Sequence, residues 1–97
     1  MSFSQRDKIF GLLFGCAYGD AMGMPSEMMC RTILDETFPD GIYALLPSSK
    51  NDFFKRKFKA GEVTDDTVNT LLVCDSIIED GKFDTELYLR KLLRWAD

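Results

Sequence analysis

The sequence contains no histidine. This excludes Ser-His-Asp triads, histidine general bases and histidine metal ligands, so any acid–base chemistry has to come from carboxylates. Cysteine is scarce, and Cys16, Cys30 and Cys74 show no CxxC spacing, which indicates neither a zinc site nor a disulfide framework. We therefore expect a cytoplasmic protein whose reactive groups are carboxylates.

Positive charge and long apolar runs are also lacking. Twelve basic residues stand against 16 acidic ones, a net charge of -4, which argues against a nucleic-acid partner that needs a broad basic surface. The apolar stretch over residues 9–18 is interrupted by glycines and closed by Asp20, well short of the roughly 20 residues that cross a bilayer. We therefore expect no export signal and no membrane partner.

The regular patterns that remain are helical, so we predict an all-α fold. Apolar residues recur with helical spacing over residues 5–22, over residues 64–81 and from residue 84 onward. Residues 32–38 are compatible with a further short helix, and no strand pattern of comparable strength is present. At 97 residues the chain is large enough for one domain and too small for two.

Capping signals support these boundaries. Ser4 with Asp7 three residues later is close to a capping box for the first helix. Gly81 is a typical C-terminal stop for the second helix, and the Asp84 side chain can cap the backbone two or three residues further on. Each helix is therefore predicted with a defined start or end.

The first predicted helix carries a stripe of glycines, spaced four residues apart. They are Gly11, Gly15, Gly19 and Gly23. Each costs a helix roughly 1 kcal/mol relative to alanine, so we expect another backbone to pack closely on this stripe. The rest of the helix is apolar nearly all round, as is typical of a helix at the centre of a larger protein.

A basic run, residues 55–59, lies in the irregular region between the first and second predicted helices. We interpret it as a solvated surface stretch, with a phosphate contact as the alternative.

Two adjacent carboxylates stand in the stretch Gly-Glu-Val-Thr-Asp-Asp-Thr, residues 61–67. In one interpretation Thr64 is an N-cap and Asp65 and Asp66 fill the first helical turn, where free N–H groups favour negative charge. In the other, the three side chains turn oxygens toward one hard cation such as magnesium or manganese. Two further carboxylates, Asp20 and Glu27, lie near Pro25, where the first predicted helix ends. Because they could contribute to the same site, we keep the cation interpretation beside the capping interpretation.

Residues 15–27 (GCAYGDAMGMPSE) and 61–67 (GEVTDDT) together resemble the two N-terminal motifs of the ADP-ribosylglycohydrolases, which include the dinitrogenase reductase-activating glycohydrolases. The blocks occur in the family's order and near its spacing. The resemblance covers the whole chain but only the N-terminal part of the family domain. It implies the N-terminal part of an orthogonal, all-helical fold.

The resemblance also implies an activity and a site. The reaction would be hydrolysis of the glycosidic bond between ADP-ribose and a protein side chain or related acceptor, at a binuclear magnesium or manganese centre. Thr64, Asp65 and Asp66 match metal ligands. Glu27 matches the acidic residue that positions or deprotonates water, and Asp20 matches the aspartate of the opening motif. The resemblance thus makes Glu27 and Asp20 the candidate catalytic residues. The partners implied are an ADP-ribosylated protein or an ADP-ribose-containing small molecule.

One family element is missing from the sequence. The C-terminal Asp-x-Asp motif that completes the family's metal centre has no counterpart, because no two aspartates stand two apart. We therefore expect residues 1–97 to form a single, incomplete domain of a longer enzyme. The alternatives are a short protein that completes its site as a homo-oligomer or with a second chain, and a non-catalytic protein that holds a divalent cation or a nucleotide.

Overall fold

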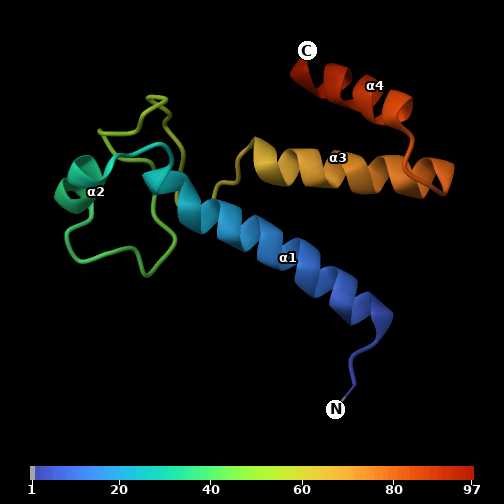
Figure 1. Ribbon diagram of the computed structural model, residues 1–97, viewed down its shortest axis with the longest axis horizontal. Coiled ribbons are helices and arrows are strands. Elements are labelled where there is room, and N and C mark those ends of the chain that lie inside the picture. Colours follow the sequence, from blue (N-terminus) through green and yellow to red (C-terminus); the bar gives the residue numbers. More distant parts are fainter. Residues whose placement is uncertain (1) are drawn as a thin grey trace. The chain divides into compact units, whose positions relative to one another are not determined.

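The computed structural model describes residues 2–97, and within that range every regular element is helical. The helices are α1 (Gln5–Gly23), the 3-10 helix η1 (Met24–Ser26), α2 (Arg31–Thr37), α3 (Asp65–Asp80) and α4 (Thr85–Ala96), shown in Figure 1. The all-α prediction is confirmed. The chain divides into two compact units, residues 2–64 and Asp65–Asp97, and each is described by itself. The expected single domain stays a prediction.

Helix α1 begins with the predicted capping box. The Ser4 hydroxyl accepts a hydrogen bond from the Asp7 backbone N–H at 3.1 Å, and the Asp7 carboxylate accepts one from the Ser4 backbone N–H at 3.3 Å. These bonds satisfy two of the backbone donors that a helix start leaves open. The helix ends at Gly23, where Pro25 enters η1 at a position that needs no backbone N–H.

The apolar surface of α1 is largely uncovered. Ala21 is its buried residue, whereas Leu12 is 72% exposed. Phe10, Phe14 and Tyr18 stack on one another along the helix, with ring centroids 6.0 and 6.1 Å apart. A Cβ atom added at any of the four stripe glycines would meet no neighbouring atom within 4 Å, so the close packing expected there is not found within residues 2–64.

The core of the first unit lies where α1 passes into η1 and meets the loop of residues 48–64. Met24 and Pro25 are buried there, together with the polar residues Asp52 and Thr64. Ser48 holds this loop in a hairpin-like turn: its backbone N–H donates to the Phe58 carbonyl at 3.0 Å, and its hydroxyl accepts from the Phe58 N–H at 2.9 Å. Hydrogen bonds between polar groups therefore make up much of this core, whereas apolar contacts dominate larger cores.

The second unit is an antiparallel pair of helices, α3 and α4, as Figure 1 shows. Helix α3 stops at Gly81, which has a φ of 78° and donates its N–H to the Ile77 carbonyl at 2.8 Å, as predicted. Lys91 of α4 forms ion pairs with Asp75 and Glu79 of α3. Among the described residues, no helix combines the length and the apolar character that a bilayer crossing requires.

Asp84 caps α4, and its removal tests the capping prediction. Its Oδ1 accepts from the backbone N–H groups of Glu86 at 2.9 Å and of Leu87 at 3.4 Å. We expect Asp84→Ala to lower the free energy of unfolding by about 1 kcal/mol, and Asp84→Asn to retain most of it. Urea unfolding followed by circular dichroism measures both. Asp80→Ala at the end of α3 is the control, because a carboxylate there opposes the helix dipole; equal losses for Asp80→Ala and Asp84→Ala would contradict the capping role.

Candidate functional site

Asp20 and Thr64 are brought together by the fold although 44 residues separate them. The Asp20 carboxylate accepts two hydrogen bonds from Thr64, one from the backbone N–H at 2.8 Å and one from the hydroxyl at 2.7 Å. Thr64 is only 6% exposed, and Asp20 is half-buried in the last turns of α1. Two of the predicted site residues therefore form one well-defined contact.

Asp65 and Asp66 form the first turn of α3, which begins directly after Thr64. Both are exposed to solvent. The first-turn placement is confirmed, and the free N–H groups and dipole at a helix N-terminus favour each negative charge by about 0.3–1 kcal/mol. The same exposure leaves carboxylate oxygens accessible to a cation, so the metal-ligand role of Thr64, Asp65 and Asp66 stays a prediction.

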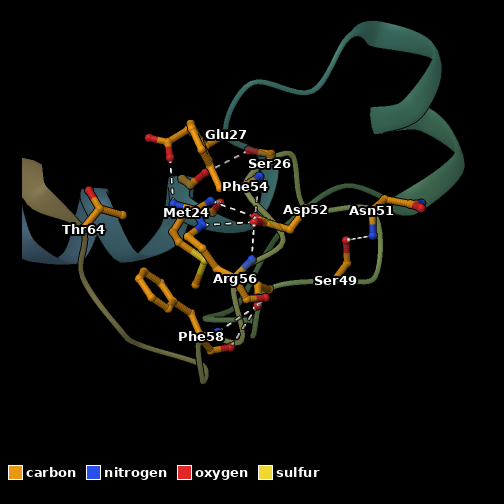
Figure 2. Close-up of polar contacts among 12 residues, drawn as sticks. Met24, Ser26, Glu27, Ser49, Asn51, Asp52, Phe54, Arg56, Phe58 and Thr64 are labelled. Carbon is orange, nitrogen blue, oxygen red and sulfur yellow. Dashed lines mark hydrogen bonds and ion pairs between the residues drawn. The ribbon is translucent and has the colours of Figure 1, made fainter.

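Glu27 follows η1 and is held by an arginine. Its Oε1 accepts from the Arg56 guanidinium at 2.8 Å, and the same guanidinium donates to the Met24 carbonyl at 3.2 Å (Figure 2). About a third of the Glu27 side chain, 35%, remains exposed. The carboxylate is thus fixed by an ion pair while part of the side chain remains in contact with solvent.

Asp52 anchors this arginine from the interior of the unit. Its side chain is 1% exposed and lies 2.8 Å from the Arg56 guanidinium, with a second side-chain bond at 3.1 Å. The backbone N–H groups of Phe54 and Arg56 also donate to it, at 3.1 and 2.9 Å. Hydrogen bonding from Arg56 lowers the pKa of Asp52 despite its burial, and the same bonds raise the pKa of Arg56.

The interpretation of residues 55–59 as a solvated surface stretch is wrong for Arg56. Its side chain is 15% exposed, and its guanidinium carbon lies 4.9 Å from the Phe54 ring centroid and 5.2 Å from that of Phe58. The lysines on either side are exposed, as expected. The four-residue spacing of Asp52 and Arg56 could have indicated this ion pair from the sequence. It is the spacing of ion pairs on helices, although here both residues lie in a loop.

The side chains available for a metal are of the right kind but are few. Thr64, Asp65 and Asp66 offer a hydroxyl and two carboxylates, which are the hard oxygen donors that magnesium and manganese prefer. No cluster of three or more histidine, cysteine or acidic side chains in residues 2–97 is arranged to hold a metal. These donors therefore fit a divalent cation in chemistry, while a full coordination shell of about six oxygens needs further ligands.

Comparison with known proteins gives a consistent result. A protein-family model described as ADP-ribosylglycohydrolase matches residues 1–97. The uncharacterized protein YegU of Escherichia coli is 41% identical over 93 residues, which cover 95% of this chain and 28% of YegU. The ADP-ribosylarginine hydrolase Tri1 of Serratia proteamaculans is 35% identical over 91 residues, which cover 92% of this chain and 21% of the relative.

A second ADP-ribosylarginine hydrolase Tri1, from Pseudomonas putida, is 34% identical over 89 residues, covering 92% of this chain and 21% of the relative. The chain therefore spans less than a third of the length of each of these relatives. No solved structure gives a significant match.

Two ion pairs with the same residue types and spacing allow a matched test of the Arg56 network. We expect Arg56→Ala to lower the free energy of unfolding by about 2 kcal/mol or more, because it leaves the buried Asp52 carboxylate without its charged partner. Arg31→Ala breaks the Arg31–Asp35 pair, whose side chains are 85% and 61% exposed, and is expected to cost less than about 0.5 kcal/mol. Urea unfolding of both variants makes the comparison, and similar losses would contradict the anchoring role of Arg56.

The lowered pKa of Asp52 predicts a specific acid sensitivity. Ionised Asp52 stabilises the fold at pH values above the pKa of an aspartate in the unfolded chain, about 3.9. This contribution is lost as the pH falls through the lower pKa that Asp52 has in the folded protein. Below about pH 4 the unfolding free energy of the wild type should therefore fall more steeply than that of Asp52→Asn. The two proteins share every other carboxylate, so parallel curves would contradict the prediction. Asp35→Asn, at an exposed position, is the control.

Proposed function

The chain belongs to the ADP-ribosylglycohydrolase family, and from this premise we propose that it supplies the N-terminal part of a site for metal-dependent hydrolysis of an ADP-ribosyl glycosidic bond. The bond would join ADP-ribose to a protein side chain or a related acceptor. The observation that carries the proposal is the pairing of Asp20 with Thr64 immediately before Asp65 and Asp66. It links the two sequence blocks that match the family.

Thr64, Asp65 and Asp66 would hold magnesium or manganese, and a binuclear centre would take its further ligands from water, additional chain, a second copy or another polypeptide. When bound, a divalent cation lowers the pKa of a coordinated water and gives an acidic site the positive charge that a pyrophosphate-bearing ligand needs. This accounts for an anionic substrate at a protein with a net charge of -4.

Glu27 is the residue we assign to the water. Glycosidic cleavage passes through an oxocarbenium-like transition state and requires a water molecule activated on one face of the ribose. A carboxylate serves as general base when it is fixed within hydrogen-bonding reach of that water. Arg56 fixes Glu27 at 2.8 Å while leaving part of the side chain exposed, which supports the assignment.

Arginine-linked ADP-ribose is the first acceptor to test, since two relatives carry the name ADP-ribosylarginine hydrolase. The alternative is a helical module that holds a divalent cation or a nucleotide without cleaving it.

Native mass spectrometry with and without magnesium tests the metal. We expect the wild type to retain one or more magnesium ions, and the double variant Asp65→Asn/Asp66→Asn to lose them with little change in the circular dichroism spectrum, because Asn removes the charge at nearly constant size. The double variant Asp35→Asn/Asp40→Asn, on and after α2, should bind as the wild type does. Equal magnesium retention by all three proteins would rule out Asp65 and Asp66 as ligands.

The same spectra report whether the chain is alone, dimeric or joined to a second polypeptide. The species that holds magnesium is then assayed for release of ADP-ribose from an ADP-ribosylated arginine substrate. The hydrolase proposal expects release that Glu27→Gln reduces by about 100-fold or more. Metal retention without any release would favour the non-catalytic module.

A further inference from the structure

The Asp20 carboxylate receives both polar hydrogens of a single residue. The backbone N–H of Thr64 donates to Oδ2 at 2.8 Å and the Thr64 hydroxyl donates to Oδ1 at 2.7 Å. A two-point contact of this kind fixes the backbone and the side-chain rotamer together. Threonine is already stiff about its first side-chain torsion because it is branched at Cβ, so little freedom remains at Thr64.

The direction of the hydroxyl bond has a chemical consequence. A threonine hydroxyl has one proton and two lone pairs, and at Thr64 the proton points to Asp20. The lone pairs are then the part of the hydroxyl that can act toward a cation. A carboxylate that accepts the proton of a ligand also increases the electron density on the ligand atom, as second partners of metal ligands commonly do.

From this geometry we propose that Asp20 is a positioning residue that acts through Thr64, orienting and polarising its hydroxyl for a divalent cation, and does not itself touch the reacting atoms. The inference rests on the proposed function, because it assumes that Thr64 is a ligand. The family resemblance suggests a catalytic role for Asp20, whereas this proposal makes Asp20 the residue that orients the Thr64 hydroxyl.

The placement of Asp20 suits this role. It lies near the end of a 19-residue helix, and its backbone carbonyl accepts from the Met24 N–H in the last turn of α1. Thr64 closes a long irregular loop, and loops are more mobile than the helices they connect. A rigid element therefore imposes its geometry on the loop residue that precedes Asp65, which is how precise ligand positions are usually built.

The test is a double-mutant cycle in the intact chain, with Mn²⁺ alone as the probe. The four proteins are the wild type, Asp20→Asn, Thr64→Val and the double variant. Mn²⁺ affinity is measured by electron paramagnetic resonance and by calorimetry, well below the thermal midpoint of the weakest protein. We expect Asp20→Asn to weaken Mn²⁺ binding by about 10- to 100-fold. In the Thr64→Val background, Asp20→Asn should have no further effect on Mn²⁺ affinity, because the hydroxyl through which Asp20 acts on the cation is absent.

Two controls separate positioning from general destabilisation. Thr64→Ser keeps the hydroxyl and should keep both the Mn²⁺ affinity and its sensitivity to Asp20→Asn. Asp35→Asn removes an exposed carboxylate on α2 and should leave the affinity unchanged. Thermal unfolding of every variant is followed in parallel by circular dichroism.

The outcomes are distinguishable. If Asp20→Asn weakens Mn²⁺ binding equally with and without the Thr64 hydroxyl, Asp20 acts directly and the inference is overturned. If it lowers the thermal midpoint and leaves the affinity intact, Asp20 is only a structural brace and the inference is again overturned. If the wild type binds no Mn²⁺, the metal site of the proposed function itself fails, and the inference falls with it.

Discussion

The buried ion pair of Asp52 and Arg56 is the interaction on which the first unit depends. Few apolar side chains are buried in this unit, so a charged pair at 2.8 Å and its hydrogen bonds fix the long loop against the end of α1. Such a pair stabilises the fold only when every remaining donor and acceptor is satisfied. Asp52 meets this condition through two backbone N–H groups, and no buried side-chain polar atom in residues 2–97 lacks a partner.

The same network connects stability to the candidate site. The Arg56 guanidinium reaches Asp52 inside the unit and Glu27 at its surface, so the anchor of the loop is also the partner of the proposed base. A second connection, from Asp20 to Thr64, fixes the end of the loop where α3 is about to begin. The loop is thus tied at both points to the C-terminal end of α1 and to η1, and these ties position the carboxylate and the hydroxyl that we assign to the reaction.

The helices could be read from the sequence because the forces that start and stop them act over a few residues. The Ser4–Asp7 box, the Gly81 stop and the Asp84 cap all lie where their spacing indicated. The glycine stripe is different, because its spacing places the glycines on one face of α1 but what packs on that face depends on atoms outside the helix. Within residues 2–64, no neighbouring atom lies within 4 Å of a Cβ atom added to any of them.

The sequence by itself determined the all-helical class, the helix ends, the family motifs and the residue types that could hold a cation, because each depends on local spacing and side-chain chemistry. Only the tertiary structure showed that the Arg56 side chain is largely buried and forms an ion pair with Glu27, and that the Asp20 carboxylate accepts hydrogen bonds from Thr64. These contacts join residues 29 and 44 positions apart. Such pairings depend on the path of the irregular loop. Local propensity does not specify that path, because the loop is stabilised by contacts that it makes only after the chain has folded.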